Sequence, residues 1–213
     1  MVKNIYKVNL IQEQELDVLN EVDGVPWSKA NDLIHFESPW SDEKISKIVF
    51  KALWNDVDLF FRFEVEDKSI HIEELNDSYE SIGSSDRVEL FFRQDSRLNP
   101  YYCLEIDSKA RIMDFKASPD RKFDFEWNWP TEQIKVKSKI SKKGFIVEGS
   151  ISINSLKSLN LIKNGFIEAG IYRAKYNVND FSEYTPTWIT WVNPMTNLPD
   201  FHIDSSFGVL KLA

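Results

Sequence analysis

The amino-acid sequence predicts an all-β protein, an antiparallel β-sandwich of the jelly-roll type with few short helices. Apolar and polar residues alternate at period two in many short segments, which is typical of strands. Asn, Pro, Gly and Ser separate these segments, as turns require. No amphipathic stretch is long enough for the crossover helix that joins parallel strands. The composition has no break or repeat, so we expect a single domain over residues 1–213.

The expected elements follow in chain order. A short helix is predicted at 13–20, and residues 47–67 predict two strands around a turn at Asn55-Asp56, because both residues tolerate turn geometry. Three consecutive strands are predicted at 86–95, 101–107 and 110–115, after a polar loop at 66–86. A second loop at 116–131 precedes the plainest hairpin, at 132–153, and a short helix is expected at 154–160.

The strand "DRVELFF" has two distinct faces. Val88, Leu90 and Phe92 fall on one face and are expected in the core, together with Val147 and Ile151 of the later hairpin. Arg87, Glu89, Phe91 and Arg93 fall on the other face, which the pattern predicts to be available to solvent or to a ligand.

Composition excludes several classes of function. A net charge of −8 without a Lys/Arg block argues against nucleic acid as a partner. The apolar runs are too short for a membrane-spanning segment, and the polar, acidic N-terminus predicts no export signal within this chain. Cys103 is the single cysteine, so neither an internal disulfide nor a thiolate metal cage can form.

Candidate catalytic groups are few. The histidines are His35, His71 and His202; we expect His71 at the surface and His202 to hold a loop by hydrogen bonding. The strand glutamates Glu64, Glu89, Glu105 and Glu148 could share a sheet face as a glycosidase-like pair, or form a cross-strand charge ladder with Arg62, Arg87 and Arg173. The acidic loop at 66–86 could bind a structural calcium ion, although it lacks an EF-hand spacing.

The tryptophans are more informative about function than the histidines and glutamates. Trp54 sits at a hairpin and is expected in the core, whereas Trp127, Trp129, Trp188 and Trp191 lie in segments interrupted by Pro and Asn. An indole can stack on the C–H face of a sugar ring while Arg, Glu or Asn hydrogen-bond to its hydroxyls. Each of these tryptophans could instead close an end of the sandwich.

Six segments in order resemble the carbohydrate-binding modules of family 9. They are "DRVELFF", "YYCLEID" with "RIMDF", "GFIVEGSISINSL", "YRAKY", "WITWVNP" and "DFHIDSSFGVLKL", within a match from about Trp27 to the C-terminus. The resemblance implies a jelly-roll-like sandwich that binds glycans such as cellulose, xylan or their chain ends without cleaving them. It further implies an extracellular or periplasmic place, in some cases within a larger carbohydrate-degrading system, and no cofactor beyond the open question of calcium.

By position, the resemblance assigns the site residues. Arg87 is similar to the family's sugar-contacting arginine with Glu89 as its orienter, and Arg173 of "YRAKY" is a further candidate. Trp188 or Trp191 resembles one of two stacking tryptophans. The other normally precedes "DRVELFF", where this chain offers only Tyr79 or His71. We expect Trp191 to stack, because Asn193-Pro194 turns the chain there, and Trp188 to pack inward.

Two other functions remain open. The same sandwich resembles haem-binding domains of respiratory dehydrogenase subunits, for which Met113 and Met195 are the available internal methionines. A hydrolase acting through two strand glutamates is the enzyme alternative.

Overall fold

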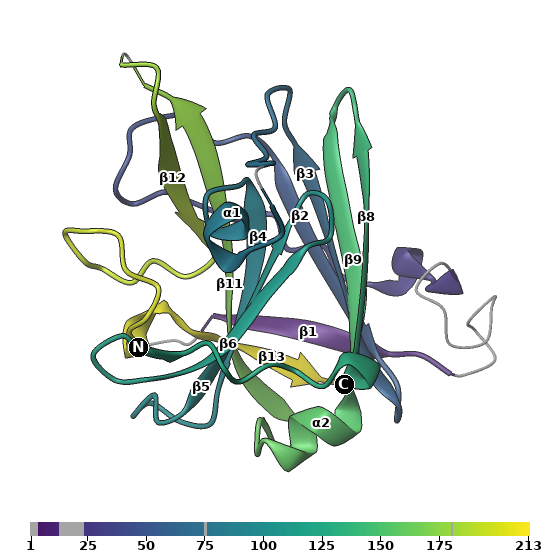
Figure 1. Cartoon of the computed structure of the whole chain (residues 1–213). Coiled ribbons are helices and arrows are strands. Elements are labelled where there is room, and N and C mark those ends of the chain that lie inside the picture. Colours follow the sequence, from purple (N-terminus) through teal and green to yellow (C-terminus); the bar gives the residue numbers. More distant parts are fainter. Residues whose placement is uncertain (1–3, 13–23, 75, 180) are drawn as a thin grey trace.

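The computed structural model describes residues 4–12, 24–74, 76–179 and 181–213, and this part of the chain holds 13 strands and two short α-helices (Figure 1). The all-β prediction is confirmed. The strands are β1 Ile5–Leu10, β2 Ile48–Trp54, β3 Asp58–Glu66, β4 Arg87–Arg93, β5 Tyr101–Asp107, β6 Ile112–Ser118, β7 Lys122–Asp124, β8 Ile134–Ser141, β9 Gly144–Ser152, β10 Ile162–Lys163, β11 Phe166–Val178, β12 Tyr184–Thr190 and β13 Gly208–Leu212.

The helices agree in part with the sequence pattern. α2 (Ile153–Ser158) is the helix expected at 154–160, and its N-cap Ser152 accepts a hydrogen bond from the backbone N–H of Asn154. α1 (Tyr79–Gly83) lies within the loop predicted at 66–86 and was not expected. The helix predicted at 13–20 lies outside the described residues. None of the described helices is long and apolar enough to cross a membrane.

The strands form a curled sheet that folds into two layers. One layer runs β7-β6-β5-β4-β11-β13, with β10 and β12 also paired to β11, and the other runs β2-β3-β9-β8. In Figure 1 the pair β11 and β12 stands on the left of the view, and β8 and β9 stand on the right. β1 joins the layers, because it pairs with both β13 and β2.

The two pairings of β1 are parallel, and the other strand pairings of the described residues are antiparallel, as the predicted sandwich requires. Ile5 pairs with Val209 and Leu10 pairs with Trp54, so the partners come from distant parts of the chain. A period-two pattern identifies hairpin neighbours well, but it carries no information on such long-range pairing.

The predicted hairpins are confirmed. β2 and β3 flank the turn at Asn55, whose Oδ1 accepts hydrogen bonds from the N–H groups of Val57 and Asp58 at 2.9 and 2.7 Å. β8 and β9 pair over their full length around a turn that ends at Gly144. Gly144 has a φ of +148°, and a Cβ there would lie 1.8 Å from the carbonyl oxygen of Val65, so glycine is required.

The core lies between the layers. Val88, Leu90, Phe92, Val147 and Ile151 are each at most 1% exposed and belong to the main cluster, as predicted.

The other face of β4 is covered rather than solvated, so of the two expected alternatives the solvent-exposed one is wrong, whereas Arg87 and Glu89 line a pocket. All seven residues of β4 are buried. A second group, here called the outer cluster, packs on this face and contains Ile82, Phe91, Leu98, Tyr101, Cys103, Met113, Phe115, Ala117, Tyr172, Phe201 and Phe207. Side chains from the C-terminal loop and from β12 lie over the sheet here, and the space left beside them is a pocket.

Candidate carbohydrate-binding pocket

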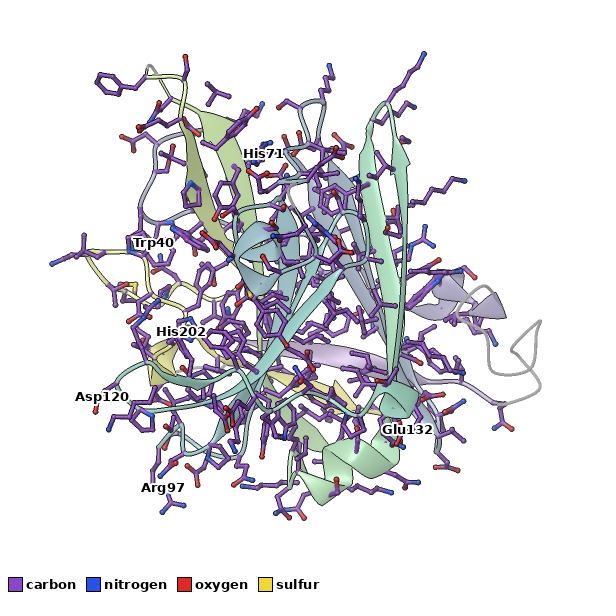
Figure 2. The ribbon with its side chains drawn as sticks, in the orientation of Figure 1. Trp40, His71, Arg97, Asp120, Glu132 and His202 are labelled. Carbon is purple, nitrogen blue, oxygen red and sulfur yellow. The ribbon has the colours of Figure 1, made fainter. Side chains whose placement is uncertain are left out.

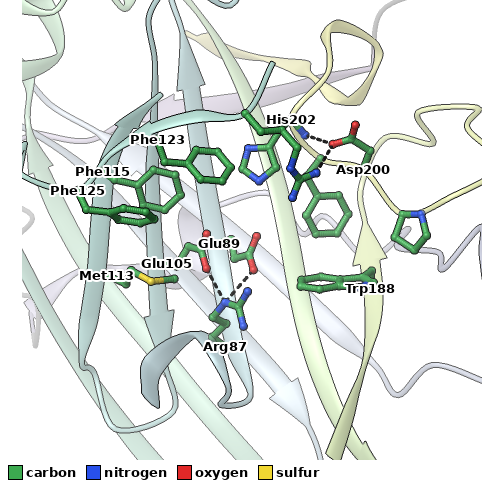
Figure 3. Close-up of a pocket in the computed structure, with 13 residues that line it drawn as sticks. Arg87, Glu89, Glu105, Met113, Phe115, Phe123, Phe125, Trp188, Asp200 and His202 are labelled. Carbon is green, nitrogen blue, oxygen red and sulfur yellow. Dashed lines mark hydrogen bonds and ion pairs between the residues drawn. The ribbon is translucent and has the colours of Figure 1, made fainter. Parts of the chain in front are cut away.

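A cavity of about 210 Å³ opens on the outer face of the sheet, above β4 and β5 (Figure 3). Its lining comes from β4, β5, β6, β7, β12, the residues that flank β7 and the loop at 199–202. It consists of Arg87, Glu89, Glu105, Met113, Phe115, Arg121, Phe123, Phe125, Trp188, Pro199, Asp200, Phe201 and His202. The pocket therefore combines an aromatic wall with a charged floor.

Strand register brings the floor together. Arg87 on β4 pairs with Ala174 on β11, and Ala174 pairs with Trp188 on β12. Residues paired across neighbouring strands share a face of the sheet, so these three side chains form one row. Two residues further along β4, Glu89 pairs with Glu105 on β5. The two carboxyl groups therefore lie on the same face as Arg87, in the next row of side chains.

The Arg87 guanidinium is held from two sides. Its Nε donates a hydrogen bond to Glu105 Oε2 at 2.6 Å, and its Nη1 donates one to the Gly83 carbonyl at 2.5 Å. Its Cζ lies 5.5 Å from the centroid of the Trp188 ring, within the range of a cation–π contact. The small side chain of Ala174 between them leaves room for this approach.

The two glutamates of the floor differ in their partners. Glu105 accepts the Arg87 hydrogen bond, whereas Glu89 Oε1 lies 3.0 Å from the same nitrogen and has no hydrogen bond within the described residues. Burial and the neighbouring Glu105 raise the pKa of Glu89 to about 8, against the opposing effect of Arg87. Burial also raises the pKa of Glu105, and Arg87 counters it.

Phenylalanines form the wall opposite Trp188. Phe115 lies 5.2 Å from Phe123 and 4.8 Å from Phe125, measured between ring centroids. Figure 3 shows these rings on one side of the Arg87, Glu89 and Glu105 group and Trp188 on the other side. Sequence analysis missed this wall. The alternation in "FDF" was a signal, but nothing local showed that it lies over β4.

The rim of the pocket is polar. Asp200 pairs with Arg121 at 3.1 Å, and His202 Nδ1 lies 2.9 Å from the Tyr101 hydroxyl, so His202 fixes its loop by a hydrogen bond as predicted. Burial, with Arg121 and Arg87 nearby, lowers the pKa of His202 to about 3, which keeps the ring neutral. Figure 2 shows His71 well apart from His202; His71 stacks on Tyr184 with ring centroids 3.5 Å apart.

The positions expected for the Trp188 and Trp191 side chains are reversed in the structure. Trp188 lines the pocket, whereas Trp191 is 7% exposed and belongs to the main core cluster. Trp188 and Trp191 do lie on opposite faces of the sheet, as the period-two alternation predicted. The choice between them was wrong, because the register of β12 on β11 places Trp188 beside Ala174 on the outer face.

Other predicted site residues lie outside the pocket lining. Tyr79 packs beside it, with its ring centroid 5.7 Å from that of Phe125. Arg173 is 1% exposed, with its Cζ 5.7 Å from the ring of the core residue Phe145, and hydrogen-bonds to Asp67. Because side chains alternate along β11, Arg173 points to the opposite face of the sheet from Tyr172, which belongs to the outer cluster.

The charge ladder is confirmed for two of its three arginines. Arg62 contacts Glu64 and Glu148 at 2.9 Å each, and Arg87 contacts Glu89 and Glu105. Arg173 is the exception, since its ion-pair partners are aspartates rather than strand glutamates.

The aspartates at the two ends of the loop considered for calcium already pair with a lysine of β11. Lys175 Nζ lies 3.2 Å from Asp67 Oδ2 and 2.9 Å from Asp86 Oδ2. Within the described residues, no group of three or more His, Cys, Asp or Glu side chains is placed to hold a metal ion.

The fold and the pocket define a class of protein, a β-sandwich module with a small concave site that joins aromatic walls to a charged floor. The sequence model of the family described as carbohydrate family 9 binding domain-like matches residues 20–213, and the chain belongs to this family. The resemblance predicted from the six segments is thereby confirmed.

Solved structures share this fold. A family 9 carbohydrate-binding module from Caldicellulosiruptor kristjanssonii in complex with glucose is 16% identical, with 99% of this chain and 96% of that chain covered and a TM-score of 0.61. The structure of a family 9 module from the same organism in complex with cellotriose is 16% identical, with 98% of this chain and 93% of that chain covered and a TM-score of 0.58. A protein from Bacteroides uniformis is 13% identical, with 99% of this chain and 100% of that chain covered and a TM-score of 0.68. No curated protein matches the chain.

Proposed function

We propose that the protein binds carbohydrate without cleaving it, and that the pocket beside Trp188 is the site. The observation that carries this proposal is the half-buried indole of Trp188 beside the buried charged groups of Arg87 and Glu89. A sugar ring has apolar C–H faces and polar hydroxyl edges. Stacking on the indole and hydrogen bonding to the charged floor would satisfy both.

The size of the pocket supports a ligand of one sugar residue. Its volume of about 210 Å³ is below the roughly 300–1,000 Å³ typical of pockets for drug-sized ligands. We therefore propose that it takes a free monosaccharide or one end of a polysaccharide such as cellulose or xylan. The complexes of the Caldicellulosiruptor module make glucose and cellotriose the first ligands to test.

Titration calorimetry with glucose, cellotriose and xylotriose tests this proposal. Replacing Trp188 by Ala removes the stacking surface and should weaken binding about tenfold to a hundredfold, or roughly 1–3 kcal/mol. Trp27→Ala is a matched control, because Trp27 is also half-buried with an arginine, Arg62, 5.9 Å from its ring, but it lies outside the pocket. Equal losses in both variants, or no binding by the parent, would refute the proposal.

A glycoside hydrolase is the second candidate, because Glu89 and Glu105 both line the pocket. Glycosidases place their two carboxyl groups on either side of the scissile bond. Here both carboxyl groups lie against the same Arg87 nitrogen, at 3.0 and 2.6 Å, so both belong to the floor. This arrangement favours binding, and we expect no release of reducing sugar from xylan or glucan.

The haem alternative is tested by a visible absorption spectrum. Met113 is 7% exposed and lies in the pocket wall, whereas Met195 is 83% exposed. A Soret band after incubation of the protein with haem would favour this alternative over sugar binding.

A further inference from the structure

A second cavity lies at one end of the sandwich, between the two layers. Its volume is about 550 Å³, and β11 and β12 line one side of it, while the end of β3 and the β8–β9 turn line the other. Thr187 and Ile189 of β12 line this cavity, whereas Trp188 between them lines the pocket described above. Because side chains alternate along a strand, the two cavities lie on opposite faces of the β11–β12 pair. In Figure 1 the β8–β9 turn marks this end of the sandwich, at the top of the view.

This cavity continues into a neighbouring one of about 320 Å³, since Glu66 and Lys143 line both. Together they form a groove, here called the basic groove, which runs from β11 and β12 past the β8–β9 turn to β8. It is larger than the pocket beside Trp188, which has about 210 Å³. The basic groove therefore has room for more than one residue of a polymer.

Unpaired lysines from three separate segments line the basic groove. Each is exposed and has no ion-pair partner within the described residues; they are Lys44, Lys47, Lys68, Lys139 and Lys143. The whole chain has a net charge of −8, so its composition does not explain this cluster of cations. Lysines on an edge strand such as β8 hinder pairing with other sheets, but Lys44, Lys47 and Lys68 lie on other segments.

A buried arginine in the basic groove has a donor without a partner. Arg173 is 1% exposed, and one of its terminal nitrogens hydrogen-bonds to Asp67, whereas its Nε has no hydrogen-bond partner within the described residues. Lys175 lies 3.2 Å from Asp67 and 2.9 Å from Asp86. Arg173 and Lys175 thus balance the charges of these two aspartates, and the exposed lysines remain uncompensated by them.

The basic groove also holds carboxylates and amides. Glu64 has ion pairs of its own, and Glu43 accepts hydrogen bonds from Asn177 and Thr187 at 3.5 and 3.3 Å. Glu66 is exposed. Because these groups hydrogen-bond to hydroxyls but repel bare negative charge, they favour a ligand that carries hydroxyls as well as anionic groups.

The basic groove gives a neutral sugar no stacking surface. Phe145 is the one aromatic residue among the described residues that line it, and it is 2% exposed. Single-stranded nucleic acids also depend on aromatic platforms for their bases. Binding here must therefore depend on charge and on hydrogen bonds to polar groups.

We propose that the basic groove is a second binding site and that its ligand is an acidic polysaccharide built of uronate residues. Each uronate carries one carboxylate, which a lysine attracts, and hydroxyls, which hydrogen-bond to the carboxylates and amides between the lysines. This site is independent of the proposed function, because the basic groove and the pocket beside Trp188 share no lining residue among the described parts of the chain.

Calorimetry with trigalacturonate, and with cellotriose as the neutral ligand, tests the proposal at two concentrations of salt. Trigalacturonate should bind, and its affinity should fall at least threefold between about 50 and 200 mM NaCl, because salt screens exposed charges. Trp188→Ala should keep this binding. Lys44→Gln combined with Lys143→Gln should weaken it about fivefold to tenfold and leave cellotriose binding unchanged.

Lys157→Gln combined with Lys211→Gln is the matched control. It removes the same charge from two exposed lysines outside the basic groove, and it should change the affinity for trigalacturonate less than about twofold. Melting temperatures check that the variants fold. The parent's binding and its dependence on salt need no variant.

Four results would overturn the proposal. These are no binding of trigalacturonate at the lower salt concentration, equal losses in the two lysine variants, loss of binding in a folded Trp188→Ala, and equal or tighter binding of a glutamate peptide or single-stranded DNA of the same charge. The last result would assign the basic groove to another class of polyanion. If trigalacturonate binds as expected while cellotriose and glucose do not bind, this site stands and the proposed function fails.

Discussion

Ala174 is a small residue on which the pocket depends. It lies between Arg87 and Trp188 in the row that crosses β4, β11 and β12, and it is fully buried. Its single methyl group leaves the space through which the guanidinium reaches the indole ring at 5.5 Å. We expect a larger side chain at this position to move the Trp188 ring away from the Arg87 guanidinium.

Gly208 has the corresponding role for Trp191. A Cβ at Gly208 would lie 2.6 Å from the Trp191 ring and 2.9 Å from the backbone oxygen of Asn4. The absence of a side chain on β13 thus makes room for this indole in the core, where it is 7% exposed.

We expect Trp191→Ala to lower the free energy of unfolding by about 3–5 kcal/mol, the usual cost of a large core-aromatic deletion. Urea denaturation followed by circular dichroism measures the loss. Trp188→Ala is the control and should cost clearly less, because Trp188 is only half-buried. A larger loss for Trp188→Ala would show that the structural and ligand-facing roles have been exchanged.

At the level of elements, the wall opposite Trp188 depends on β6 and β7. Phe115 on β6 and Phe123 on β7 are packed side chains, and Phe125 follows β7 and is 46% exposed. An exposed ring that lines a pocket can contribute to ligand binding at little cost to the fold when it is removed.

Phe125→Ala should therefore weaken sugar binding by about threefold to tenfold and lower the stability by less than about 1 kcal/mol. Phe166→Ala is the matched control, because Phe166 on β11 is similarly exposed, at 40%, and does not line this pocket. Calorimetry and thermal melting on the two variants give the comparison. Unchanged affinity in Phe125→Ala would remove this wall from the site.

The elements differ in how far the sequence could predict them. Hairpins such as β2–β3 and β8–β9 were predictable because alternation and turn residues are local signals. The place of Arg87 and Glu89 on one face followed from the same period. The role of Trp188 did not, because it depends on the register between β11 and β12, and the phenylalanine wall depends on a loop that folds over a distant strand.

At the scale of the whole molecule, β1 is the connection between the layers. It pairs with β13, which adjoins β11 in the layer that carries the pocket, and with β2 of the other layer. Tyr6 and Val8 enter the main core, and the Tyr6 hydroxyl donates a hydrogen bond to the Asn31 carbonyl at 2.5 Å. We propose on this basis that the chain unfolds as one domain, because without β1 the strands β13 and β2 would each lose a hydrogen-bonded neighbour.

Val8→Asp tests this cooperativity. Val8 is fully buried, so the variant places an unpaired carboxyl group in the core, and we expect a loss of roughly 3–5 kcal/mol in the free energy of unfolding. Lys7→Asp, at the exposed position beside it, should change stability by no more than about 0.5 kcal/mol. In Val8→Asp, the urea transitions seen by far-UV circular dichroism and by tryptophan fluorescence should move together, and sugar binding should be lost over the same range. Two separated transitions, or a pocket that still binds sugar after the first of them, would show that the two layers unfold independently. The pairings of β1 would then not make the layers a single cooperative unit.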